Sequence, residues 1–217
     1  MARVLTAITY SESAQKLIDT FNIDQFFDHK IWDTEDLEEL RKEIRDFYKI
    51  EQKAICSYCR QVISIVYPTN AHIEHIAPKS LHPEYIFEAK NLCVICSDCN
   101  QIKRNQETIN KIPDTIKKKY KTKYPDKPDD FFLVHPHFDD YDKHILIING
   151  FYVDNDSKKG NFTIGACRLN RKLSITGWEP EVVEETEIIE DFTEYIEEKN
   201  TLKKAKILEN IKRKLFF

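Results

Sequence analysis

The chain has 217 residues, a hydrophobic fraction of 41% and a formal net charge of −4 at pH 7. This size allows one domain with a sizeable core, or a small catalytic module between helical flanks. No apolar run approaches the roughly 20 residues that cross a bilayer, so the sequence excludes a helical membrane protein. The N-terminal sequence MARVLTAITYSES also lacks the layout of a signal peptide, so we expect a cytoplasmic protein with no membrane partner.

The first fifty residues have the periodicity of amphipathic helices. Apolar side chains at helical spacing predict one helix over residues 13–27. A second helix is predicted to follow Asp33 and Thr34, which can cap it, and to run to about Lys49. Its apolar stripe, which we expect in the core, consists of Leu37, Leu40, Ile44, Phe47 and Tyr48. We therefore assign residues 1–50 to an N-terminal helical region.

Strands and a helix are predicted for the next region, residues 51–112. The residue types favour strands at 62–67 and 71–76, with residues 68–70 as the turn between them. A helix should begin near residues 97–99 and continue to about residue 110. The stretch that follows, 113–130, combines basic residues with three prolines and is predicted to be a linker.

A β-hairpin and further helices are predicted for residues 131–217. The sequence HILIINGFYV at 144–153 places two apolar runs around Asn149-Gly150, which is typical of a tight hairpin. The last forty residues predict two amphipathic helices, whose apolar positions are Ile189, Phe192 and Ile196, and then Ile207, Leu208, Ile211 and Leu215. Together the elements predict the α+β fold class.

The charge is distributed unevenly along the chain. Residues 101–125 carry eight Lys and Arg against two acids, and include the run KKKYKTKY at 117–124. Residues 179–198 carry ten acids and no base. The basic stretch would suit a phosphate backbone, and a solvated linker explains it equally well. The acidic stretch is more typical of an exposed helix face.

Four of the six cysteines form two C-x-x-C pairs, Cys56/Cys59 and Cys96/Cys99. In a reducing compartment such pairs predict a bound metal rather than disulfides. Two pairs supply the four thiolates of a closed, tetrahedral and therefore structural zinc site. The alternative is a set of buried cysteines without metal. Cys93 could compete as a ligand, although it belongs to no pair.

The segment between the two pairs contains residue types that phosphodiester hydrolysis requires. His75 can act as the general base, because an imidazole with a pKa near 6.5 accepts a proton at neutral pH. Glu74 and Asn100 offer hard oxygen ligands that suit Mg²⁺ or Mn²⁺. Asn91 has both a donor and an acceptor, with which it can fix a loop that orients His75.

These residues resemble the motif of the HNH nucleases, which consists of an acid–His pair, an Asn in the middle loop and a final His or Asn on a helix. Glu74-His75, Asn91-Leu92 and Asn100 occupy the three places. The resemblance implies a zinc-braced ββα-metal module at residues 51–112. It implies that His75 is the base, that Glu74 and Asn100 bind a catalytic divalent ion, and that Asn91 organises the loop.

A narrower branch of the family is similar over roughly residues 35–172. The sequences EHIAPKS and CSDCNQIK carry this likeness, and His135-Pro136, Asp139-Asp140 and Leu169-Asn170-Arg171 extend it. Nucleases of that branch are commonly encoded beside an ATPase in bacterial anti-phage systems, including Septu-type and retron-linked ones. The resemblance therefore implies an antiviral defence nuclease with an ATPase partner.

The chain departs from many HNH enzymes at two positions, with Glu74 where Asp is common and Asn100 where His is common. Adjacent residues of a regular strand also point to opposite faces. Glu74 and His75 can therefore serve one site only if the strand ends or bulges there, and Pro78 permits this.

Several basic residues are candidates for contacts with nucleic acid. Lys79 and Lys103 are expected near phosphates, since Lys103 shares a helix face with Asn100, and Arg104 is a third candidate. His72 could touch a phosphate, but a solvent-facing strand position explains it as well. We expect His82, His135 and His137 in loops and His144 in a packing role.

The sequence thus predicts a metal-dependent HNH endonuclease that hydrolyses phosphodiester bonds in DNA. Two alternatives stay open at this point. One is a non-catalytic zinc module that binds nucleic acid through its basic stretch, and the other is a structural subunit that docks an ATPase. The first leaves the ordered set of Glu74, His75, Asn91 and Asn100 unexplained.

Overall fold

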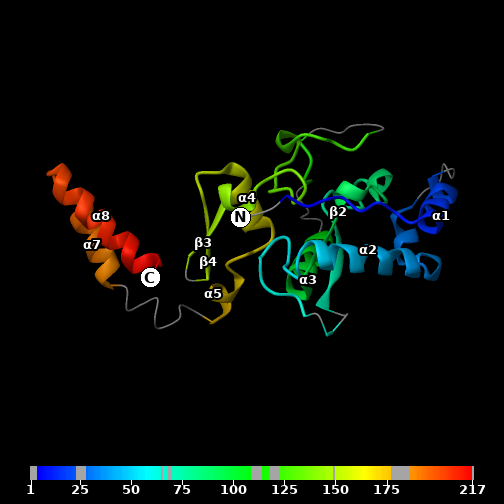
Figure 1. Ribbon diagram of the computed structural model, residues 1–217, viewed down its shortest axis with the longest axis horizontal. Helices are drawn as coiled ribbons and strands as arrows, with labels where there is room; N and C mark the ends of the chain where they lie inside the picture. Colours follow the sequence, from blue (N-terminus) through cyan, green and yellow to red (C-terminus); the bar gives the residue numbers. More distant parts are fainter. Residues whose placement is uncertain are drawn as a thin grey trace. The chain divides into compact units, whose positions relative to one another are not determined.

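A computed structural model describes residues 4–22, 28–64, 66–67, 70–108, 114–117, 123–148, 150–176 and 186–216 (Figure 1). The chain divides into two compact units. The first comprises Met1–Leu146 and Asp154–Leu169, and the second comprises Ile147–Val153 and Asn170–Phe217. Among the described residues, no helix has the length and apolar character needed to span a bilayer.

Two α-helices open the first unit, α1 (Glu12–Asn22) and α2 (Glu38–Glu51). The first helix is confirmed, although residues 23–27 of the predicted range lie outside the described part of the chain. The prediction that Asp33 or Thr34 caps α2 is wrong. The short 3₁₀ helices η1 (His29–Asp33) and η2 (Glu35–Leu37) lie there instead, and the Thr34 hydroxyl donates back to the Ile31 carbonyl at 2.8 Å. These turns bury Trp32, which is 5% exposed.

The apolar stripe of α2 packs into the core. Leu37, Leu40, Ile44 and Tyr48 are buried, as the sequence predicts, whereas Phe47 of the predicted stripe is only partly buried. Directly after the helix, the buried Gln52 amide bridges two other segments. It donates to the carbonyls of Ile55 and Val94, and its oxygen accepts from the Val94 amide at 2.7 Å.

The strand pair of the first unit differs from the predicted one. Strand β1 (His72–His75) pairs antiparallel with β2 (Leu92–Ile95), with His75 opposite Leu92 and Glu74 opposite Cys93. The predicted strand at 62–67 is wrong, because among its described residues only Val62 pairs, in an isolated bridge with Ile55. Apolar residues alone do not make a strand without a paired edge, and Val62, Val66 and Tyr67 are exposed.

Helix α3 (Ser97–Thr108) follows β2 directly, and residues 109–110 of its predicted extent lie outside the described part. Helix α2 packs against both strands and α3 against β1 (Figure 1). The described chain therefore has the mixed helix and strand content expected for the α+β class. The order strand, strand, helix runs through the segment that contains Glu74, His75, Asn91 and Asn100.

The predicted linker takes part in the core of this unit. Ile116 and Tyr124 are buried in a cluster with Ala77, Tyr85 and Phe131, and Ile116 pairs with Phe131 in an isolated bridge. The short 3₁₀ helices η4 (Pro83–Tyr85), η5 (Ala89–Asn91) and η6 (Pro128–Asp130) belong to the same region. Residues 118–122 of the basic run lie outside the described part.

The predicted hairpin is confirmed as β3 (Ile145–Ile148) and β4 (Phe151–Asp154), with Gly150 at a φ of 81°. A 3₁₀ helix, η7 (Tyr141–Lys143), precedes it. Helix α4 (Lys158–Ala166) follows and is capped by the Ser157 hydroxyl. A Cβ on Gly160 would overlap the His144 carbonyl oxygen, so this close approach requires glycine.

The second unit contains α5 (Arg171–Thr176) and the two predicted C-terminal helices, α7 (Thr186–Glu197) and α8 (Thr201–Phe216). The last two pack together, and Asn210 donates to Asp191 at 3.1 Å. Asn170 fixes the backbone of β4 from the side, because its amide accepts from and donates to Tyr152 at 2.8 Å in each direction.

Candidate functional site

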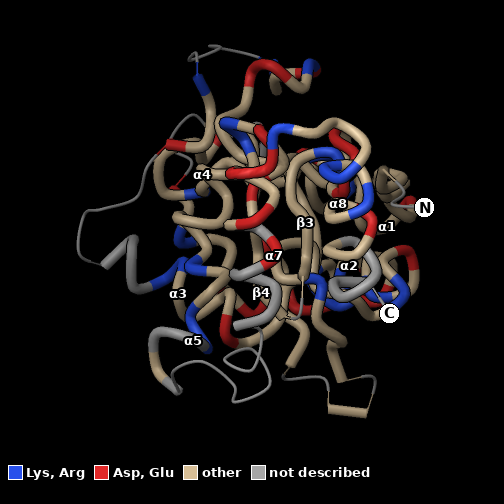
Figure 2. The backbone as a smooth tube through the Cα atoms, turned by 90° about the vertical axis from the view of Figure 1, so that its left-hand side faces the viewer, with Lys and Arg blue, Asp and Glu red and all other residues tan. Residues whose placement is uncertain are grey.

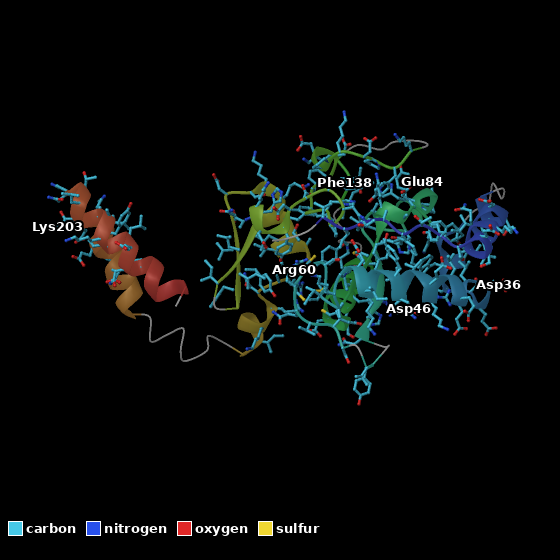
Figure 3. All side chains as sticks on the ribbon, in the orientation of Figure 1. Asp36, Asp46, Arg60, Glu84, Phe138 and Lys203 are labelled. Atoms are coloured by element: carbon cyan, nitrogen blue, oxygen red, sulfur yellow. The ribbon has the colours of Figure 1, made fainter. Side chains whose placement is uncertain are left out.

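The four paired cysteines converge at one point. The ligand atoms of Cys56, Cys59, Cys96 and Cys99 lie within 4.8 Å of one another, and all four residues are buried. The Cys96 amide donates to the Cys56 sulfur at 3.4 Å. Arg60, which is labelled in Figure 3, follows the first pair and has a φ of 58°. Four sulfurs at this spacing fit a tetrahedral zinc ion with no open ligand position, so the donor set suits a structural site.

Position separates the four sulfurs of the cluster from the other two cysteines, Cys93 and Cys167. Hydrogen bonds among the four thiols shift their pKa values in opposite directions, lowering that of Cys59 to about 7 and raising that of Cys56. Cys93 lies outside the cluster, and burial raises the pKa of its thiol above the usual range. Cys93 is therefore a neutral core thiol in this fold, and it does not compete as a ligand.

The cluster is anchored to the rest of the first unit by aromatic side chains. The Tyr141 hydroxyl donates to the Tyr58 carbonyl, inside the first cysteine pair, at 2.7 Å. The Arg60 guanidinium lies over the Tyr141 ring, 5.1 Å from its centre. The Tyr58 hydroxyl in turn donates to Glu74 at 3.0 Å. The cysteine cluster is thus connected to β1 through one tyrosine.

A pocket of about 490 Å³ lies on the side of β1 that borders α2 and α3. The sequence predicts seven residues for catalysis or nucleic-acid contact. Six of them line this pocket, and Asn91 does not. Seven further residues complete the wall of the pocket. The predicted ones are Glu74, His75, Lys79, Asn100, Lys103 and Arg104, and the others are Trp32, Asp33, Arg41, Arg45, Ala71, His72 and Ile73.

His75 is held rigidly at the end of β1. Its Nε2 lies 3.1 Å from the Ile86 carbonyl oxygen, which can only accept, so Nε2 carries the proton and Nδ1 keeps a free lone pair. The Trp32 ring meets the imidazole edge-on, with 4.4 Å between ring centres. Burial lowers the pKa of His75 to about 3, so the ring is neutral at pH 7.

Glu74 is buried and already paired. Its Oε1 accepts from Lys103 at 2.8 Å and from Tyr58 at 3.0 Å. Lys103, which the sequence predicts at a phosphate, is itself 8% exposed and is turned to this carboxylate. The ladder of β1 runs regularly to His75 and ends there without a bulge, and Glu74 and His75 both line the pocket.

The two asparagines occupy different environments. The Asn100 side chain lines the pocket, is partly exposed, and makes no hydrogen bond to any residue that the structure describes. Asn91 is fully buried outside the pocket. Its Oδ1 accepts from the Ala77 amide at 2.6 Å, and its Nδ2 donates to the carbonyls of Ala77 and Tyr85. Asn91 therefore holds the loop after β1 and does not face the pocket.

Three contributions to the site have no clear signal in the sequence. Trp32 lies more than forty positions before His75, and the buried Gln52 and Tyr58 stand next to or inside the cysteine motif without a pattern that marks them. His135 and His137 lie outside helices and strands, as predicted, and both are buried there. His137 Nε2 donates to the Leu92 carbonyl at 2.8 Å, at the start of β2.

Comparison with known proteins agrees with this geometry over one segment. Residues 56–106 match the family model of the HNH endonuclease. The matched segment contains both cysteine pairs and the residues that surround His75, and it supports the HNH family for this part of the chain. An HNH domain suggests nuclease activity and binding of nucleic acid, although members of the family can be non-catalytic. No curated protein and no solved structure matched the chain.

Replacing one cluster cysteine should remove the bound metal. We expect Cys99→Ser to lose its zinc and to lower the free energy of unfolding by on the order of 5 kcal/mol, because a structural zinc contributes directly to folding. Zinc content by atomic absorption and denaturant unfolding measure both effects. Cys93→Ala is the matched control, since it removes a neighbouring buried thiol outside the cluster. Equal zinc in Cys99→Ser and wild type would contradict the assignment.

Three buried neutral imidazoles should make stability depend on pH. Burial lowers the pKa of His75 from 6.5 to about 3, and it also lowers the pKa values of His135 and His137. Below about pH 6.5 the unfolded chain therefore binds protons that the folded chain does not. The free energy of unfolding is highest above pH 6.5 and falls as the pH drops toward 3, by up to about 1.4 kcal/mol per pH unit for each imidazole.

Denaturant unfolding at a series of pH values, with zinc content followed in parallel, measures this slope. His137→Gln keeps a donor for the Leu92 carbonyl and should flatten the slope by one proton. His29→Gln is the control, because His29 is a partly exposed surface residue. If His137→Gln leaves the dependence of the free energy of unfolding on pH unchanged, the His137 imidazole does not contribute to it.

Proposed function

We propose that the chain is a metal-dependent HNH endonuclease that hydrolyses phosphodiester bonds in DNA through a ββα-metal site. The observation that carries the proposal is the meeting of Glu74, His75 and Asn100 at one pocket, next to the four-cysteine cluster. A general base, two oxygen ligands and a surrounding set of cations are the groups that this reaction requires.

His75 is the proposed general base. Its Nε2 proton is engaged by the Ile86 carbonyl, so Nδ1 is the atom that takes a proton from water. Burial keeps the ring neutral, so Nδ1 has a free lone pair, but it also weakens the ring as a base. A bound cation would have to lower the pKa of the attacking water for this base to be effective. Trp32 packs against the ring and limits its rotation. An oriented base of this kind contributes roughly 10² to 10⁴ in rate.

Glu74 and Asn100 are the proposed ligands of the catalytic cation. Both contacts that Glu74 makes with described residues go to Oε1, so we assign Oε2 to the cation. The Asn100 carboxamide has no partner within the described residues and is available as the second ligand. A bound Mg²⁺ or Mn²⁺ would stabilise the negative charge that develops on the phosphate and on the departing 3′-oxygen.

Asn91 and the zinc cluster position the reactive groups, and basic residues hold the substrate. Asn91 fixes the loop that carries the Ile86 carbonyl, and so it acts on His75 indirectly. Lys79, Lys103 and Arg104 are the proposed contacts for nucleic acid. Lys79 is paired with Asp33 at 3.2 Å and Lys103 with Glu74, so an incoming phosphate would compete with a carboxylate at both.

Removing the base should abolish cleavage without removing zinc. We expect His75→Ala to lower the rate of Mg²⁺-dependent plasmid cleavage by about 10² or more and to keep the zinc content of the wild type. His137→Gln is the matched control, because it removes another buried imidazole that donates to a carbonyl but lies outside the pocket. Wild-type cleavage by His75→Ala would exclude His75 and favour a non-catalytic module that binds nucleic acid through its zinc-braced segment.

We propose further that the nuclease serves in cytoplasmic anti-phage defence together with an ATPase partner. The support is the likeness of EHIAPKS and CSDCNQIK to the branch of HNH nucleases found in such systems. A nuclease that is always active would harm its host, which favours control by a partner. We expect the chain to nick plasmid faster when it is co-purified with the product of a neighbouring ATPase gene. No association and no change in nicking would exclude this partner, and association without cleavage in either sample would favour a docking subunit.

A further inference from the structure

Helix α2 presents two arginines to the pocket, and they differ in what they contact. Arg41 donates to the backbone carbonyls of Trp32 and Thr34, the second at 2.8 Å, and so it holds the turns before the helix in place. Arg45 lies one turn later. Its Nε is buried and has no hydrogen-bond partner among the described residues. A buried donor without a partner is rare in folded proteins, and because Arg45 lines the pocket, a ligand in the pocket can supply that partner.

The neighbours of Arg45 on its own helix are not acids. The residues three and four positions away, which share its face, are Arg41, Lys42, Tyr48 and Lys49. Within one turn of Arg45, helix α2 therefore offers no carboxylate on the face of this side chain, and Glu38 lies two turns earlier.

Three of the five acids of α2 lie on another side of the helix. Glu39, Glu43 and Asp46 line a separate groove with residues of α1, and Figure 3 labels Asp46 on this helix. Lys42 lines the same groove. Figure 2 colours the basic residues blue and the acidic ones red along the chain. Helix α2 thus turns both of its arginines to the pocket that contains His75, and three of its acids to the α1 groove.

We propose that Arg45 binds a backbone phosphate of the nucleic-acid strand that is cleaved at His75. A guanidinium matches the geometry of two phosphate oxygens, and an arginine that is not already paired binds without breaking a contact within the protein. The N-terminal helical region is then part of the substrate interface, although it precedes the HNH segment at residues 56–106. This inference rests on the proposed nuclease function, because it assigns the polyanion that enters the same pocket.

The test compares three variants of the full, zinc-loaded chain. Arg45→Gln removes the charge, Arg45→Lys keeps it, and Lys42→Gln removes a cation of the same helix that lines the α1 groove instead. Binding of a fluorescently labelled DNA duplex is measured in the His75→Ala background over a range of salt concentrations. Plasmid cleavage with Mg²⁺ is measured with His75 intact.

We expect Arg45→Gln to lower DNA affinity about tenfold at low salt and to reduce the slope of log Kd against log salt by about one, because one phosphate contact is lost. The KM for cleavage should rise by a similar factor, while Arg45→Lys and Lys42→Gln keep the wild-type slope. A wild-type slope in Arg45→Gln would overturn the inference, and so would an equal loss in Arg45→Lys, which would mean a structural role. If no variant cleaves but Arg45→Gln still lowers the slope, the phosphate contact stands and the nuclease proposal fails.

Discussion

The convergence of four cysteine sulfurs within 4.8 Å is the constraint on which the rest of the site depends. One pair follows α2 and the other lies where β2 passes into α3, so the cluster joins segments that are about forty residues apart in the chain. A two-stranded sheet of four-residue strands has little stability of its own. A zinc ion on the cluster would tie the end of β2 to the segment after α2, and so small a sheet could then present His75 and Glu74 at fixed positions.

The loop that faces His75 is held by a second network, from residues far along the chain. His135 Nδ1 accepts from the His137 amide, so its Nε2 donates to the Tyr124 oxygen, and the Tyr124 hydroxyl then donates to Asn91 Oδ1. Asn91 passes this restraint to the loop through Ala77 and Tyr85. Burial keeps the His135 ring neutral, which the single donor in this chain of hydrogen bonds requires. Such a network is most restrictive when every member is paired.

The sequence predicts the parts that depend on spacing and periodicity. The stripe of α2, the β3–β4 hairpin, the two C-terminal helices and the cluster of Cys56, Cys59, Cys96 and Cys99 all follow from local patterns. The pairing of β1 with β2 does not, because sixteen residues separate the strands and no turn motif joins them. No sequence pattern marks Trp32, Gln52 or Arg45 as part of the site, because their contacts there form only when α2 packs against the strands. The linker prediction for residues 113–130 missed the burial of Tyr124 for the same reason, because this burial depends on partners distant in sequence.

The charges of the pocket explain how a chain of net charge −4 can accept a polyanion. Glu74 is buried, and an uncompensated carboxylate there would be costly, so the ion pair with Lys103 offsets its desolvation. Lys79 has a similar partner in Asp33. Cations outnumber carboxylates in the lining of the pocket, which contains Arg41, Arg45, Lys79, Lys103 and Arg104 against Asp33 and Glu74. The paired cations hold the protein side of the site in place, whereas the Arg45 Nε has no partner in the part of the chain that the structure describes. If Arg45 binds phosphate as proposed, the attraction for the substrate lies beside the imidazole, while three acids of α2 line the α1 groove.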